Sequence, residues 1–219
     1  ISVRLVGSEM CIRDSAYAPL LKEEEKKYEN YSKSIRRRAA IIGGHNMDDY
    51  PLKMHVFNRA RLIKNSKNRI PYGVDLIQKY KRESWIVFTE NKKQAKEFNK
   101  IINTKGFKSA LYNTDLDSAE RLENLSKFKK ADLNVLVTCT ALDEGFDMPE
   151  ADGALILSAS SSKRQRVQRM GRVLRITENK PNALIVTVYS SKTEFDKLME
   201  EAKRYHKEGV PVSWKRQDR

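Results

Sequence analysis

Several residues and patterns that define common protein classes are scarce in this sequence. Among its 219 residues there are only two cysteines, Cys11 and Cys139, with no close pairing and no histidine cluster nearby. This spacing supports neither a disulfide framework nor a zinc site, and it fits a reducing cytoplasm. The histidines are equally scattered, and we interpret His45, His55 and His206 as surface or capping residues.

Membrane and secretion signals are also missing from the sequence. No apolar run approaches the roughly 20 residues that a helix needs to cross a bilayer. The first residues lack the charged, apolar and small-residue order of a secretory signal. We therefore expect no membrane partner.

Two parts of a complete nucleotide-hydrolysing site are absent as well. The chain has no G-x-x-x-x-G-K-[ST] loop, whose backbone would cradle phosphates, and no Asp-Glu pair follows a strand in the expected order to hold Mg²⁺. Asp48-Asp49 lies in a weakly patterned stretch and does not follow a predicted strand. Asp143-Glu144 belongs to the loop segment Val135–Pro149. We expect this chain alone not to hydrolyse a nucleoside triphosphate.

Basic residues, in contrast, are abundant. Lys and Arg total 43 against 29 Asp and Glu, which gives a net charge of +14. Such a balance favours polyanions through phosphate contacts and counterion release, although a Lys-rich solvated surface would have the same composition. Nucleic acid is the first partner to test.

The first 15 residues, ISVRLVGSEMCIRDS, share no pattern with the rest of the chain. The string resembles a translated sequencing adapter, and a disordered natural terminus is the alternative. We leave residues 1–15 out of the predicted fold, expect no function from them, and expect the natural protein to begin further upstream.

Residues 16–83 are predicted to be helical and basic. Apolar residues recur at helical spacing from Leu20 to about Ala40, and Gly43 and Gly44 end this pattern. Two further helices are predicted around Val56–Ile63 and Val74–Tyr80. We interpret the region as a connector or insertion that leads into the main domain.

From residue 84 the pattern changes to short apolar runs that alternate with amphipathic helices, which is typical of βα units in a parallel sheet. The predicted strands are Trp85–Thr89, Ser109–Tyr112, Val135–Thr138, Ala154–Leu157 and Ala183–Tyr189. The predicted helices are Lys92–Lys105, a helix that Asp117 caps, and Thr193–His206. The sequence thus predicts an α/β domain over residues 84–208, with a parallel sheet of about five or six strands and helices on both faces, and a basic tail over 209–219.

Ligands of parallel sheets lie beyond the carboxyl ends of the strands, and two loops there have unusual compositions. The first, Val135–Pro149 (VLVTCTALDEGFDMP), brings hydroxyls, Gly145 and Asp147 to a strand end. Such groups can bind phosphates or a ribose, but they are also ordinary turn chemistry. The composition leaves both interpretations open.

The second loop, Ser161–Arg175 (SSKRQRVQRMGRVLR), carries several arginines. A helix that Gly171 ends would let Arg172 and Arg175 project together. Each of two guanidinium groups can donate a pair of parallel hydrogen bonds to the oxygens of a triphosphate. A solvated basic helix is equally compatible with this spacing.

These segments together resemble a known family. Superfamily-two helicases have three motifs, IV, V and VI, that are similar to the segments WIVFTEN, VTCTALDEGFDMPEAD and QRMGRVLR of this chain, in that order. The separations also agree, and the similarity extends over about Trp85 to Tyr189. The amino-acid sequences of these motifs are most similar to those of the branch that includes XPB, phage helicases and restriction-type motors. The resemblance implies the C-terminal RecA-like half of a helicase or translocase that uses ATP with Mg²⁺, whose phosphate loop and metal carboxylates belong to a missing N-terminal RecA-like lobe.

The resemblance also implies roles for individual residues. Arg172 and Arg175 would be arginine fingers, Gln168 would lie near the phosphates or the attacking water with Arg169 beside it, and Gly145 and Asp147 would couple the nucleotide to nucleic acid. Contacts with nucleic acid are expected from Thr89, Asn91, Asn113, Arg121, Thr138 and Thr140. Cys139 stands where many relatives have Thr, which leaves open whether Thr138 or Thr140 touches a phosphate.

No residue in these motifs is expected to recognise a 2′-hydroxyl, the group that distinguishes RNA from DNA. The preference for DNA over RNA therefore depends on the resemblance alone. Two alternatives remain at this point. One is a RecA-like module that binds nucleic acid without turnover. The other is a duplex-translocating motor subunit of a restriction or defence complex.

Overall fold

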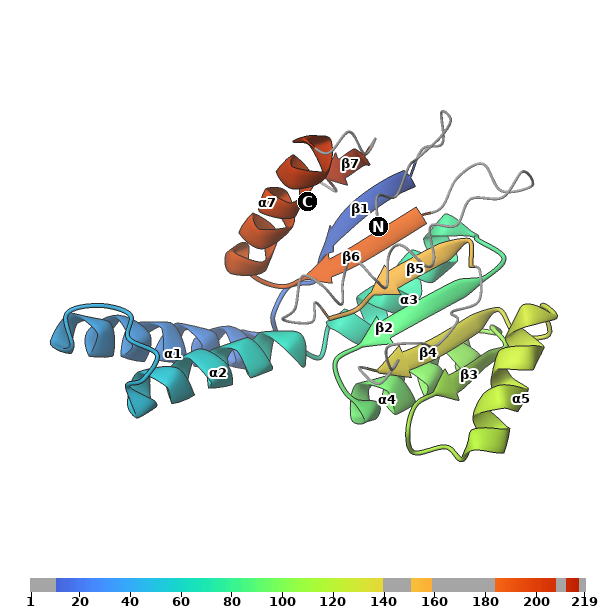
Figure 1. Cartoon of the computed structure of the whole chain (residues 1–219), viewed down its shortest axis with the longest axis horizontal. Coiled ribbons are helices and arrows are strands. Elements are labelled where there is room, and N and C mark those ends of the chain that lie inside the picture. Colours follow the sequence, from blue (N-terminus) through green and yellow to red (C-terminus); the bar gives the residue numbers. More distant parts are fainter. Residues whose placement is uncertain (1–10, 140–150, 159–183, 208–211, 217–219) are drawn as a thin grey trace.

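The computed structural model describes residues 11–139, 151–158, 184–207 and 212–216. Its centre is one sheet in which all pairings are parallel, with the strand order β3-β4-β2-β5-β6-β1-β7 (Figure 1). The predicted α/β fold with a parallel sheet is therefore confirmed. No helix among the described residues is both long and apolar enough to cross a membrane.

All five predicted strands are present. They are β2 (Trp85–Thr89), β3 (Ser109–Tyr112), β4 (Val135–Cys139), β5 (Gly153–Ile156) and β6 (Leu184–Tyr189). Every residue of β2 and β4 is buried, as expected for parallel strands that are covered on both faces. This burial explains why uninterrupted apolar runs marked them in the sequence.

Two further strands were not predicted. β1 (Cys11–Tyr17) lies between β6 and β7 (Val212–Arg216), and it pairs with both in parallel. β1 contains part of the segment 1–15 that we left out of the fold, and β7 lies in the predicted basic tail. Neither strand has the uninterrupted apolar run that marks β2 to β6, so side-chain patterning does not reveal them. The sheet consequently has seven strands.

The predicted helices are present, and α2 and α3 begin earlier than the predicted Val56 and Val74. The helices are α1 (Lys22–Ile41), α2 (Tyr50–Lys64), α3 (Arg69–Tyr80), α4 (Lys92–Thr104), α5 (Ser118–Lys129) and α7 (Lys192–Lys207). Asp117 caps α5 as predicted, since its side chain accepts a hydrogen bond from the Glu120 backbone N–H at 2.7 Å.

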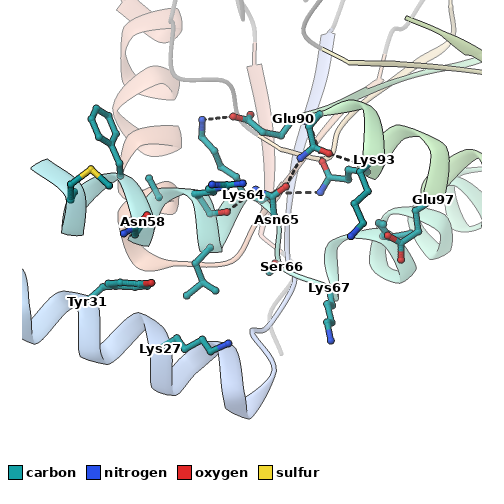
Figure 2. Close-up of a pocket in the computed structure, with 18 residues that line it drawn as sticks. Lys27, Tyr31, Asn58, Lys64, Asn65, Ser66, Lys67, Glu90, Lys93 and Glu97 are labelled. Atoms are coloured by element: carbon teal, nitrogen blue, oxygen red, sulfur yellow. Dashed lines mark hydrogen bonds and ion pairs between the residues drawn. The ribbon is translucent and has the colours of Figure 1, made fainter. Parts of the chain in front are cut away.

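Helices α1 and α2 form a hairpin that projects beyond the carboxyl ends of the strands (Figure 1). Asp49 stabilises it in two ways. Its carboxylate caps α2 by accepting from the Leu52 N–H at 2.9 Å, and it pairs with Arg38 of α1 at 2.6 Å. Figure 2 shows the other end of α2, where Lys64 pairs with Glu90 at the edge of the sheet.

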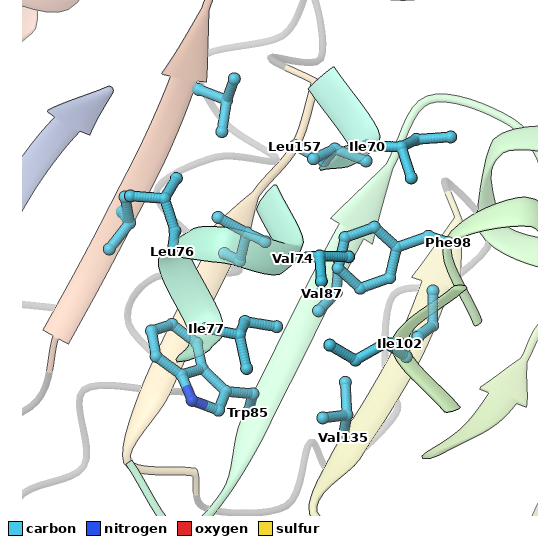
Figure 3. Close-up of a cluster of buried hydrophobic side chains, with 14 of the residues drawn as sticks. Ile70, Val74, Leu76, Ile77, Trp85, Val87, Phe98, Ile102, Val135 and Leu157 are labelled. Carbon is cyan, nitrogen blue, oxygen red and sulfur yellow. The ribbon is translucent and has the colours of Figure 1, made fainter. Parts of the chain in front are cut away.

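The core has one layer of side chains on each face of the sheet. On one face α3 and α4 cover the strands with residues such as Ile77 and Phe98 (Figure 3). On the other face α5 contributes Leu125 and Phe128. Because α3 packs into this core, it belongs with the sheet rather than with the projecting hairpin. Gly73 allows this close packing, since a Cβ there would lie 2.6 Å from the Leu157 side chain.

Arg69 joins the base of the hairpin to the sheet. Its side chain is completely buried, and it donates hydrogen bonds to the carbonyls of Ile63, Leu157 and Val188, each at 2.8 Å. It also forms an ion pair with Glu194 of α7 at 2.6 Å. Burial lowers the pKa of Arg69, and the Glu194 charge opposes that shift. One guanidinium thus connects α2, β5, β6 and α7.

We predict that Arg69→Met strongly destabilises the fold. The substitution leaves Glu194 without its cation and the buried carbonyls of Leu157 and Val188 without this donor, and breaking a buried ion pair in this way costs about 3–5 kcal/mol. The free energy of unfolding in urea measures the effect. Lys127→Ala, which removes an exposed ion pair with Glu123, is the control and should leave the midpoint unchanged. Equal midpoints for the two variants would contradict the role given to Arg69.

We also predict that the hairpin loosens in acid. Arg38 and the Leu52 N–H hold the pKa of Asp49 below its ordinary value of 3.8. The contribution of Asp49 is therefore fully present above that value and is lost as the pH falls through the lower folded pKa. Asp49→Asn keeps the cap but not the charge, so its helicity in circular dichroism should change less over the same acid range. If Asp49→Asn lost helicity over the same acid range as the parent, the Asp49 charge would not be the cause of the loosening.

Candidate functional site

The candidate site is the edge where the parallel strands end. Strands β2, β3, β4 and β5 run in the same direction, and their register aligns Thr89 with Cys139 and Tyr112 with Thr138. The carboxyl ends of these strands are therefore neighbours, and this is the position where parallel α/β sheets bind ligands.

Thr89 and Thr138 lie at this edge with their hydroxyls already engaged. The Thr89 hydroxyl donates to the Thr138 carbonyl at 3.0 Å, and the Thr138 hydroxyl donates to the Cys139 carbonyl at 3.1 Å. Both residues are almost completely buried. In this arrangement the two threonines join β2 to β4, and either hydroxyl would have to exchange its partner to contact a phosphate.

Asn91 forms the beginning of α4. Its Oδ1 accepts from the Gln94 backbone N–H at 2.9 Å, and its Nδ2 donates to Asn65 at the end of α2. The residue is half-buried. It therefore lies between the sheet edge and the helical hairpin.

Asn113, in the loop after β3, has an unused donor. Its Oδ1 accepts from the Asp115 backbone N–H at 2.9 Å, but its Nδ2 is buried and has no hydrogen-bond partner among the described residues. A buried donor without a partner costs about 1–3 kcal/mol. A ligand oxygen would relieve that cost once a change in the loop exposes this nitrogen.

Arg121 lies in the first turn of α5, beside this loop. It makes only local hydrogen bonds, to the Asp117 carbonyl at 3.4 Å and to the Ser118 hydroxyl at 3.2 Å. Within the part of the chain that the structure describes, no ion pair holds its guanidinium. Its charge is available to an anion.

Carboxylates at this edge are paired with lysines. Asp115 contacts Lys92 and Lys96, whose hydrogen bonds lower the pKa of its carboxyl, and Glu90 pairs with Lys64 at 2.7 Å. The edge therefore presents donors and positive charge more than free carboxylates.

The remaining predicted site residues lie outside the described residues. They are Thr140, Gly145, Asp147, Gln168, Arg169, Arg172 and Arg175. Of the last described residues before them, Cys139 ends β4 and Ser158 follows β5 at the same edge.

Sequence reasoning missed a groove between the hairpin and α4, which we call the hairpin groove. It has a volume of about 1510 Å³, and residues of α1, α2, α4 and the loops at Asn65–Lys67 and Glu90–Asn91 line it (Figure 2). We treated residues 16–83 as a connector, so their surface was not considered. The signal that could have found it is the row of Tyr50, Met54 and Phe57 at helical spacing among basic residues.

Comparison with known proteins gives consistent matches. Residues 68–177, half of the chain, match the family described as helicase conserved C-terminal domain. The DNA 3'-5' translocase XPB2 of Sulfurisphaera tokodaii is 30% identical over 193 residues, which cover 81% of this chain and 42% of that protein. The ATP-dependent rRNA helicase RRP3 of Scheffersomyces stipitis is 25% identical over 118 residues, which cover 54% of this chain and 24% of that protein. The chain thus spans less than half the length of either relative.

A solved structure supports the same fold. The C-terminal domain of the DEAD-box protein Dbp5 superposes with a TM-score of 0.59 and 19% identity, covering 69% of this chain and 85% of that domain. The family match, the relatives and the sheet agree with the order of motifs in the sequence. This chain belongs to the helicase conserved C-terminal domain family and contains the C-terminal RecA-like lobe of a superfamily-two helicase.

Proposed function

We propose that this lobe completes the ATP site of a nucleic-acid motor and holds nucleic acid along the carboxyl edge of its sheet. The observation that carries the proposal is the unpartnered Nδ2 of Asn113 at that edge, together with the guanidinium of Arg121 in the first turn of the following helix, which has no ion pair within the described residues. Backbone phosphates of nucleic acid accept hydrogen bonds from amide and guanidinium groups of this kind.

ATP with Mg²⁺ fits this arrangement only if the metal ligands come from elsewhere. The carboxylates Glu90 and Asp115 are tied to lysines, and the sequence has no phosphate-binding loop. A second lobe would hold the metal and the phosphate chain, and this lobe would contribute cations. We assign that task to Arg172 and Arg175, with Gln168 and Arg169 beside them and with Gly145 and Asp147 between nucleotide and nucleic acid.

The cations act on the charge that develops during phosphoryl transfer. An arginine finger stabilises negative charge on the transferred group more strongly in the transition state than in the ground state. Its guanidinium keeps its charge at any physiological pH and can donate two parallel hydrogen bonds. Removal of an arginine finger therefore lowers turnover much more than it weakens ATP binding.

We predict that Arg175→Ala lowers nucleic-acid-stimulated ATP hydrolysis by about 10³- to 10⁵-fold. The assay uses a protein in which this chain is joined to a phosphate-loop lobe, and it compares kcat with ATP affinity. Arg172→Ala should have an effect of the same kind, and Lys163→Ala is the matched removal of one charge outside the motif. Near-parental turnover in Arg175→Ala would exclude the finger assignment.

We predict that Asn113→Asp weakens nucleic-acid binding by about tenfold or more. The substitution keeps the oxygen that accepts from the Asp115 N–H, but it replaces the free donor by a negative charge, and hydrogen bonds to charged groups contribute about 1.5–3 kcal/mol. Fluorescence anisotropy with labelled oligonucleotides measures the change. Asn134→Asp introduces the same charge at the opposite edge of the sheet, before β4, and serves as control. Equal affinity of the two variants would contradict a contact at Asn113.

We favour DNA as the nucleic acid along which the motor moves, because the name of the XPB2 relative specifies DNA. The RRP3 relative is named for rRNA, so the same protein should be assayed with matched DNA and RNA strands. Stronger ATPase stimulation by RNA would overturn the preference. A strand-displacement assay beside a triplex-displacement assay separates a helicase from a duplex translocase.

A further inference from the structure

The hairpin groove combines exposed apolar side chains with unpaired positive charge. Figure 2 shows Lys27 and Tyr31 of α1 on one side and Lys93 and Glu97 of α4 on the other, with α2 between them. Helix α4 is separated in sequence from the α1–α2 hairpin by α3 and β2. The groove is therefore a product of the fold.

Its apolar part is a row of large side chains on α2. Met54 and Phe57 line the groove and are 37% and 52% exposed, and Tyr50, one turn before Met54, is 70% exposed. The Lys53 ammonium lies 5.9 Å from the Phe57 ring centroid. Exposed apolar rows of this kind usually mark a binding surface.

Its polar part is cationic. Lys27, Arg61, Lys67 and Lys93 line the groove and are exposed, and none of them forms an ion pair within the described residues. Helix α2 contains no acidic residue. Of the two carboxylates in the groove, Glu90 is paired with Lys64 and Glu97 stands alone against four cations. The groove therefore has an excess of positive charge.

The groove also reaches the predicted nucleic-acid edge. Asn91, which we expect to contact nucleic acid, lines it and is hydrogen-bonded to Asn65 at the end of α2. A nucleic-acid strand that is bound along the carboxyl edge can thus continue into the groove, and it would remain in contact with positive charge along this path.

We infer that the hairpin groove binds an unpaired strand of nucleic acid, with its phosphates near Arg61, Lys67 and Lys93 and a base on the Phe57 ring. The inference rests on the proposed function and adds a second contact region to it. An unpaired strand fits better than a duplex, because stacking on Phe57 requires the face of a base that is not enclosed in a helix. Aromatic side chains interleaved with basic ones are the usual means of holding single strands without sequence preference.

The test is a salt titration of binding with the whole chain. The probe is a fluorescein-labelled oligothymidylate of about 20 nucleotides, which exceeds the ~16 nucleotides of a large single-strand site. Anisotropy gives the affinity between about 50 and 200 mM salt. Circular dichroism confirms that each variant retains the helical content of the parent.

The two kinds of interaction predict different results. Phe57→Ala should weaken binding about fivefold or more at every salt concentration without changing the salt slope. Arg61→Ala with Lys93→Ala should reduce the slope of log K against log salt by about 0.7 for each phosphate that is no longer neutralised. Leu122→Ala, a similarly exposed apolar residue on α5, and Lys105→Ala with Lys129→Ala at the opposite edge are the matched controls. All controls should bind like the parent.

The outcomes separate this inference from the proposed function. If Asn113→Asp weakens binding while the groove variants behave like their controls, the groove does not hold the strand and the proposed function stands. If the parent chain binds neither the oligothymidylate nor a duplex of the same length, the proposed function fails and the inference fails with it. Equal decreases in affinity for strand and duplex in Phe57→Ala would overturn the stacking of an unpaired base on this ring.

Discussion

The buried guanidinium of Arg69 is the interaction on which the arrangement of this lobe depends. Parallel strands leave carbonyls without partners where they end, and the carbonyls of Leu157 and Val188 at the ends of β5 and β6 are satisfied by the same side chain. Burying a charge is costly unless it is paired and hydrogen-bonded, and Glu194 provides the pairing. The position of α3, the base of the hairpin and the beginning of α7 all follow from this one site.

A second set of hydrogen bonds surrounds that site. The Ser158 hydroxyl donates to the Lys64 carbonyl at 2.7 Å, and the Ser66 and Ser190 hydroxyls lie 3.2 Å apart. Gln94 of α4 joins the same group through the Lys64 carbonyl. The end of α2 is thereby attached to the ends of β5 and β6 and to α4. The hairpin groove and the sheet edge therefore share this junction.

The central strands were predictable because their burial is local in sequence. Five apolar runs marked β2 to β6, and Asp117 marked the beginning of α5, since each signal depends on neighbouring residues. β1 and β7 were not predictable, because neither has an apolar run to mark it, and only their backbone pairing in the folded sheet identifies them. Arg69 was equally hidden: a lone arginine before an apolar helix gives no sign that three carbonyls and a carboxylate will surround it.

The site was predicted unevenly for a related reason. Motif order located the sheet edge, and Asn91, Asn113 and Arg121 do lie there. The sequence could not show that the Thr89 and Thr138 hydroxyls would be used inside the sheet, because register decides that. The hairpin groove was missed because its sides come from α1, α2 and α4, and only the folded chain brings them together.

The attachment at Lys64–Arg69 also divides the lobe into regions of unequal local stability. Beyond that junction α1 and α2 pack mainly on each other, and only Ile35, Ala39, Leu52 and Ile63 of these helices are buried apolar residues. Local opening costs least where it exposes few buried apolar side chains. The amide hydrogens near the hairpin tip should therefore exchange with solvent well before those of α3. We therefore expect the hairpin to open locally at a free energy well below that of global unfolding, while the sheet behind it stays folded.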